Sequence, residues 1–117
     1  MKKALALTLV LILGIAGLAQ AQSIKEVYLA VKKAQLKATG TNEDIDNSIA
    51  DARAEFDLFK DSKTAKKNPQ FTDHIEAAIM ALRQAQFARE VTNEADLWTK
   101  YMHKAETELN IAKQFIE

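Results

Sequence analysis

The side chains best suited to bind a metal ion are two histidines, each of which has a carboxylate close by in the sequence. Asp73 and Glu76 flank His74, and Glu106 follows His103 by three residues, so that the latter two share one face if the segment is helical. Imidazole nitrogen and carboxylate oxygen are ligands that Cu(II), Ni(II) and Zn(II) accept. The sequence therefore predicts two candidate metal positions: His74 with Asp73 or Glu76, and His103 with Glu106.

The spacing of the two histidines argues against one shared ion. If the last turn between helices lies near Thr92, His103 faces about residue 81 and His74 faces about residue 110. The histidines then differ by roughly 10 Å along the helix axis, whereas a zinc ligand lies about 2 Å from its ion. The plain alternative is that both are surface histidines, one at a helix start and one on a helix flank.

Other chemistries lack their residues. The chain has no cysteine for covalent haem, and Met80 and Met102 with the two histidines are the remaining axial ligands after the first 21 residues. Di-iron bundles need Glu-x-x-His on two helices, whereas His103-x-x-Glu106 is the reverse order and occurs once. Neither a G-x-S-x-G elbow nor a glycine-rich phosphate loop is present. We therefore do not expect an enzyme or a resident organic cofactor.

Residues 1–21 have the three parts of a secretory signal peptide. Lysines precede a nearly unbroken apolar run from Ala4 to Ala19, which ends in the small-x-small sequence Ala19-Gln20-Ala21. The run is shorter than the roughly 20 apolar residues of a stable membrane span, and no cysteine follows it for lipid attachment. We expect cleavage after Ala21, a periplasmic or secreted product, and no membrane attachment of the mature chain.

The mature chain, residues 22–117, is expected to be one small domain of almost balanced charge. Cleavage removes two lysines and no acid, so a chain of zero net charge becomes one of −2. This charge excludes the basic excess that nucleic-acid binding needs. Since there are no disulfides, helix packing, a bound ligand or self-association must stabilise so short a chain.

Composition and capping signals predict four helices. Ser23 and Glu26 form a capping box, and Gly40 is suited to end that helix in the left-handed conformation. Asn42 is the predicted N-cap of a second helix, Pro69 starts a third, and residues 92–94 open a fourth. The polar, lysine-rich residues 61–68 indicate a linker. Apolar residues recur at helical spacing in each segment and predict the core: Ile24, Val27, Tyr28, Val31, Ala34 and Ala38; Ile45, Ile49, Ala52, Phe56 and Phe59; Ile75, Ala78, Ile79, Leu82 and Ala85; Trp98, Met102, Ala105, Leu109, Ala112 and Ile116.

Residues 22–60 and 69–117 are similar to each other at an offset of 51 residues. The triplet Thr41-Asn42-Glu43 aligns with Thr92-Asn93-Glu94, and Ile24 and Ala34 align with Ile75 and Ala85. Alanine-rich composition inflates such agreement, but a repeated turn triplet favours duplication. The sequence thus predicts an all-α fold, an antiparallel four-helix bundle from two repeated helical hairpins. Exchange of hairpins between two chains would give a swapped dimer instead.

A signal peptide followed by duplicated hairpins, with segments such as Ile75-Glu-Ala-Ala-Ile and Lys104-Ala-Glu-Thr-Glu, resembles the small metal-binding proteins of the bacterial periplasm. The resemblance spans most of the mature chain and implies a four-helix bundle that sequesters divalent metal. In that family many histidines supply the ligands. Arg53 and Lys104 stand where its pattern places histidines, so the resemblance implies weak metal binding by this chain.

A second function is compatible with the same fold. Leu29 and Leu36, matched at the repeat offset by Met80 and Phe87, lie outside the main apolar stripes. They indicate either a wide buried face or an exposed patch for a partner. The alternative to metal binding is therefore a non-catalytic protein-interaction module, or a self-associating scaffold that forms a homodimer.

Overall fold

The computed structural model describes residues 23–116, apart from residues 39 and 41. Its regular elements within that part are α2 (Ile24–Lys37), α3 (Asn42–Phe59), α4 (Lys63–Lys67), α5 (Pro69–Phe87), the π-helical turn η1 (Ala88–Thr92) and α6 (Ala95–Lys113). The predicted all-α fold class is confirmed for this part of the chain. The predicted signal peptide, residues 1–21, lies outside the described residues.

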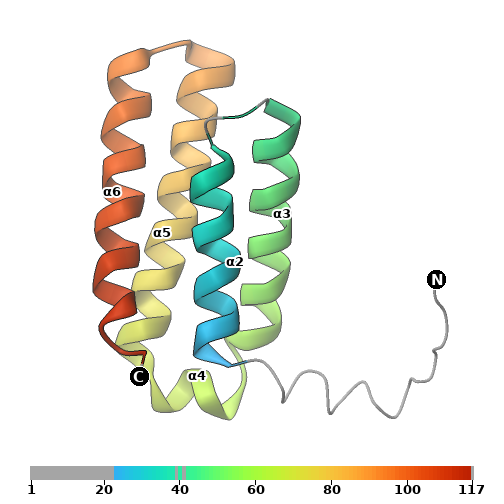
Figure 1. The fold of residues 1–117 in the computed structure, drawn as a ribbon, viewed down its shortest axis with the longest axis vertical. Helices are drawn as coiled ribbons and strands as arrows, with labels where there is room; N and C mark the ends of the chain where they lie inside the picture. Colours follow the sequence, from blue (N-terminus) through green and yellow to red (C-terminus); the bar gives the residue numbers. More distant parts are fainter. Residues whose placement is uncertain (1–22, 39, 41, 117) are drawn as a thin grey trace, which may run out of the picture.

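The four long helices lie side by side, with α4 across one end (Figure 1). Contacts are most extensive between α2 and α3 and between α5 and α6. The start of α2 and the end of α6 lie at the same end as α4, whereas η1 and the turn between α2 and α3 lie at the other end (Figure 1). The bundle therefore has two distinct ends, one with α4 and one with η1.

The core consists of the predicted apolar stripes. Every apolar position predicted in the second and third helices is buried, with exposed fractions of 5% or less. Ile24 in α2 and Trp98, Met102 and Ile116 near α6 are partly buried against this core, and the other predicted positions are fully buried. Phe59 and Phe71 meet edge to face, with ring centroids 5.9 Å apart and planes at 80°. This aromatic pair joins the end of α3 to the start of α5.

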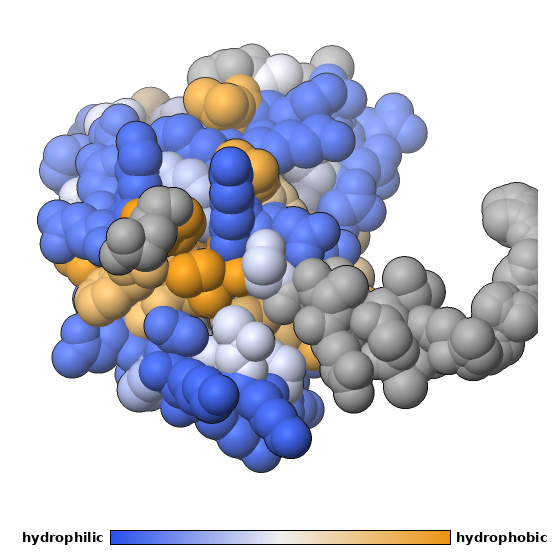
Figure 2. All heavy atoms as spheres, turned by 60° about the horizontal axis from the view of Figure 1, so that its bottom comes forward, coloured by the Kyte–Doolittle hydropathy of each residue, from blue (hydrophilic) through white to orange (hydrophobic). Residues whose placement is uncertain are grey.

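Apolar surface is visible at the end of the bundle near α4, between hydrophilic side chains (Figure 2). Partly buried Ile24 and Phe115 belong to the elements that meet at this end, the start of α2 and the segment after α6.

The segment predicted as a linker contains a short helix. Ser62 caps α4 by accepting a hydrogen bond from the Ala65 amide at 3.1 Å. The Asn68 amide group donates to the Thr64 carbonyl at 2.9 Å, and the Thr72 hydroxyl donates to the Asn68 carbonyl at 2.9 Å. Local side-chain bonds to the backbone therefore fold residues that composition alone describes as polar and lysine-rich.

Two predictions about helix ends need correction: that Gly40 is left-handed, and that Asn42 is the N-cap of the second helix. No glycine in the described part has a positive φ, so Gly40 does not end α2 in the left-handed conformation. Space is tight at Gly40, because a Cβ there would lie 3.0 Å from Asp44 Oδ2 and 3.2 Å from the Lys37 carbonyl oxygen, so these neighbours would have to shift slightly. The left-handed residue is Asn93, with φ 53° and ψ 44°. Asn93 follows η1, and α6 begins after Glu94, whose side chain makes no capping bond. Asn42 is the first residue of α3, and its side chain is outside the described set.

Candidate functional site

His74 is paired with a carboxylate that the sequence analysis did not name. Its Nδ1 atom lies 2.6 Å from Oε1 of Glu108, across the contact between α5 and α6. The side chains are 33% and 19% exposed, respectively. The sequence estimate that His74 faces about residue 110 was close in register. It could not select Glu108, because the side-chain direction around α6 decides which residue reaches His74.

The pair defines what the imidazole of His74 can do. When Nδ1–H donates to Glu108, the other ring nitrogen, Nε2, carries a lone pair and becomes the available ligand. A carboxylate that orients a histidine through the non-ligating nitrogen is the usual outer-shell arrangement at metal sites. The same geometry equally serves as an interhelical hydrogen bond, which at this exposure contributes about 1 kcal/mol or less to stability.

The other predicted ligands stand apart from this pair. Asp73, His103 and Glu106 are exposed, and their side chains form no hydrogen bond or ion pair with other described residues. Within the part of the chain that the structure describes, no group of three His, Asp or Glu side chains is arranged to hold a metal ion. His74 is therefore the predicted ligand with an organised carboxylate partner.

The opposite end of the bundle carries a second constellation, centred on Arg89. This residue lies in η1, and its Nη1 and Nη2 atoms donate to the carbonyl oxygens of Ala38 and Gly40, both at 2.8 Å. These carbonyls belong to the last turn of α2 and the residues after it, where helix carbonyls lack partners within the helix. Arg89 thus caps α2 from another helix, and its positive charge suits the negative end of the helix dipole.

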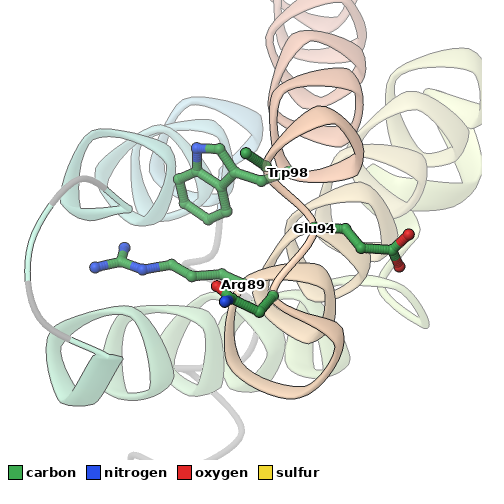
Figure 3. Close-up of a pocket in the computed structure, with 5 residues that line it drawn as sticks. Arg89, Glu94 and Trp98 are labelled. Carbon is green, nitrogen blue, oxygen red and sulfur yellow. The ribbon is translucent and has the colours of Figure 1, made fainter.

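Trp98 fixes the position of the Arg89 side chain. The guanidinium carbon of Arg89 lies 5.2 Å from the centroid of the indole ring, which is a cation–π contact. Figure 3 shows the Trp98 ring beside the extended Arg89 side chain, with Glu94 pointing the other way. These residues, with Asn93 and Ala95, line a pocket of about 400 Å³. Since two bonds of Arg89 go to the backbone directly after α2, the constellation is a clamp between η1 and the end of α2.

The sequence analysis missed Arg89 for a physical reason. A single arginine late in an amphipathic helix has no local signature, and its partners lie 51 and 49 residues away. The carbonyl groups at the end of α2 need donors, and Lys37 is the one basic residue in its last turn. A basic side chain from another segment could therefore have been expected at this end of the helix. Trp98 had been assigned to the core or an interface, and it is partly buried against the core.

The apolar residues outside the stripes are exposed, which decides between the two interpretations of them. Leu29 and its repeat counterpart Met80 are 51% and 54% exposed, and Leu36 and its counterpart Phe87 are 65% and 56% exposed. A wide buried face is therefore wrong. The four residues do not share one groove, because Leu29 and Leu36 line a shallow hollow of about 410 Å³ on α2, whereas Phe87 lines a different one of about 460 Å³.

Comparison of the chain with protein-family models, with curated proteins and with solved structures gives no match. In the described part of the chain, none of the helices has the length and apolar content that crossing a bilayer requires.

Proposed function

We propose that this chain is an exported, non-catalytic module of two repeated helical hairpins, packed as an antiparallel four-helix bundle, that functions by binding another protein surface. The observation that supports this function is the exposure of large apolar side chains at equivalent positions of both hairpins. Leu29 with Met80 and Leu36 with Phe87 are related by the offset of 51 residues. A large apolar side chain that is more than half exposed adds little to the core, so the recurrence of such side chains at matching positions favours a role in binding.

The spacing within each pair makes the argument stronger. Leu29 and Leu36 are seven residues apart on α2, and Met80 and Phe87 are seven apart on α5. Seven residues are two helical turns, so each pair forms a short stripe on one helix face. Burial of a leucine or phenylalanine side chain is worth about 1.5–3 kcal/mol. Two such side chains per stripe supply the apolar centre of a modest interface.

Site-specific photo-crosslinking in cells tests this function. A photoreactive phenylalanine analogue is placed in the full chain at Leu29, Leu36, Met80 or Phe87, and at exposed Lys104 as the matched control. We expect discrete crosslinked products, either to a second copy or to another protein, at the apolar positions and not at Lys104. A full set of apolar positions that gives no more product than Lys104 would overturn the proposal.

Weak divalent-metal binding is the second candidate function, and the His74–Glu108 pair favours it. Nδ1 of His74 lies against Glu108, so in the neutral ring with its proton on Nδ1 the Nε2 atom is the nitrogen that can bind a metal. The resemblance to periplasmic small metal-binding proteins supports the same assignment, with Cu(II), Ni(II) or Zn(II) as the ion. Asp73, and His103 with Glu106, are the further ligands that the sequence proposes.

Calorimetric titration of the exported protein with each metal tests this second function. We expect His74→Ala to remove binding at the His74 position and Glu108→Gln to weaken it by about tenfold or more, as loss of an outer-shell partner does. His103→Ala tests the separate position with Glu106, and Gln114→Ala, an exposed change that removes no proposed ligand, is the matched control. Binding no tighter than millimolar, or binding unchanged in His74→Ala, rejects the site.

A further inference from the structure

Charge is segregated between two neighbouring helices. α2 carries four lysines and one acid, whereas α3 carries six acids and one arginine. Lys33, Lys37 and Asp51 are exposed and Glu55 is half-buried. Neither lysine forms an ion pair with either acid in the part of the chain that the structure describes. Two adjacent helices therefore present opposite charges to the outside rather than neutralising each other.

Apolar side chains accompany both charged surfaces. On α2, the hollow lined by Leu29 and Leu36 is bordered by Lys32, Lys33 and Lys37. On α3, Leu58 is 55% exposed and follows Asp51 by seven residues, and exposed Ala54 lies between them. An alanine leaves room for a neighbouring helix to approach closely. Each helix thus combines an apolar centre with charges of one sign.

We infer that the face formed by α2 and α3 is the interface of a homodimer, in which α2 of each copy packs on α3 of the other. This inference rests on the proposed function and names the partner as a second copy of the chain. A two-fold axis that lies in the plane of this face and runs along the helices places the basic helix over the acidic helix twice, so both contacts are complementary at once. Leu29 and Leu36 would then be covered beside Leu58 of the other copy.

The same observations make a second copy a better occupant than an anionic membrane. A lysine-bordered leucine stripe alone would suit an anionic lipid surface. The acids of α3, which lie on the neighbouring helix, would be repelled by that surface. They are attracted by the lysines of a second α2, and this attraction raises the association rate and selects the orientation.

The first test is the mass of the protein in solution. The full chain is expressed, the exported product is purified, and its mass is measured by sedimentation velocity. We expect dimers in the micromolar range that dissociate as the salt concentration rises, because exposed charge pairs are screened. Leu29→Asp with Leu36→Asp is expected to abolish the dimer while the helical circular dichroism is retained. Thr107→Asp, an exposed change on α6, is the matched control.

Two charge-reversal variants give the decisive test, because it needs no knowledge of the register between copies. Lys33→Glu with Lys37→Glu changes the net charge of α2 from +3 to −1, and Asp51→Lys, Glu55→Lys and Asp57→Lys together change that of α3 from −5 to +1. Each variant alone opposes like charges at both contacts, so we expect each to be monomeric. Mixed together, the two variants are complementary at both contacts, and we expect a mixed dimer to form. Circular dichroism verifies that each variant is folded.

The outcomes separate this inference from the proposed function. A wild-type protein that is monomeric throughout the micromolar range, or two variants that remain monomeric on mixing, overturns the homodimer. Crosslinking at Leu29 or Leu36 to a different protein alone also overturns the homodimer, yet leaves the proposed binding function standing. Binding to anionic vesicles, lost in the lysine-reversal variant while the wild type is monomeric, would assign the face to a membrane and overturn the inference.

Discussion

The guanidinium group of Arg89 donates to the carbonyl oxygen of Ala38, the residue 51 positions earlier in the chain. Because the sequence resembles itself at an offset of 51 residues, Arg89 contacts the backbone of the residue with which it aligns. The two positions differ in role: Ala38 is buried at 1% exposure, while Arg89 extends to the residues after α2. The turn after α5 thus supplies a cap to the end of α2.

Replacing Arg89 with alanine is expected to lower the free energy of unfolding by about 1–3 kcal/mol. The variant removes two bonds from a charged donor and leaves the Ala38 and Gly40 carbonyls to water or to no partner. Arg89→Lys keeps the charge but cannot form both bonds in the planar fork, so an intermediate loss is expected. Urea denaturation followed by circular dichroism measures these values.

The matched control for Arg89 is Arg83→Ala, which removes an exposed arginine one and a half turns earlier. A surface change of this kind normally alters stability by no more than about 0.5 kcal/mol. If Arg89→Ala and Arg83→Ala destabilise equally, the clamp contributes nothing and the assignment fails.

Asn93 should tolerate glycine and resist alanine. Its left-handed conformation, with φ 53°, costs a residue with a Cβ about 1–2 kcal/mol, a cost that glycine does not incur and asparagine partly avoids. We expect Asn93→Ala to lower the free energy of unfolding by about 1 kcal/mol and Asn93→Gly to leave it almost unchanged. Thermal melting of the two variants side by side measures the difference; equal melting temperatures would contradict the turn geometry.

The core could be predicted because burial in a helix leaves a local record. Apolar residues at spacings of three and four, such as Ile45, Ile49 and Ala52, show which face is covered before any partner is known. Turn geometry leaves a weaker record. Glycine and asparagine both adopt the left-handed conformation readily, so the sequence does not say which of Gly40 and Asn93 does so. In the structure it is Asn93, and Gly40 instead lies close to Asp44 and to the Lys37 carbonyl.

Phe71 is the core residue whose shape matters most in this structure. It is fully buried and meets Phe59 edge to face. Phe71→Leu keeps most of the apolar volume and loses the aromatic contact, so a loss of about 1–2 kcal/mol is expected. Ile79→Val, another fully buried position, controls for a small cavity alone. Chemical denaturation of Phe71→Leu, Phe59→Leu and the double variant gives the coupling energy between the two rings. A coupling energy near zero would contradict a contribution from the aromatic contact.

The candidate sites were harder to predict than the core, since they depend on which side chains meet between helices. Axial register placed His74 opposite about residue 110, and Glu108 is the acid near that height. Register alone does not give the direction of a side chain around its helix. The sequence therefore left Asp73 and Glu76 as alternatives for His74 and did not single out Glu108. Ser62 was a missed signal, since a serine followed by a segment rich in lysine and alanine is an ordinary N-cap for the short helix α4.

The leucines of α2 should be replaceable without loss of the fold. Leu29 and Leu36 are more than half exposed, so Leu29→Asp with Leu36→Asp is expected to change the free energy of unfolding by less than about 1 kcal/mol. The paired reference is Val27→Asp, which buries a charge in the core and is expected to prevent folding. Near-ultraviolet circular dichroism and urea midpoints measure both. Unfolding of the leucine double variant would show that these side chains belong to the core.

Helix α4 lies at one end of the bundle and η1, which contains Arg89, lies at the other (Figure 1), so the chain connects α3 to α5 at one end and Arg89 bonds to the residues after α2 at the other. Hairpin exchange between molecules would require the shared core to open and both Arg89 bonds to break. Exchange would therefore proceed at the rate of unfolding, whereas subunits paired through their outer faces exchange at the rate at which that dimer dissociates. The time that two differently labelled samples need to mix their subunits distinguishes an intertwined dimer from one assembled through its surfaces.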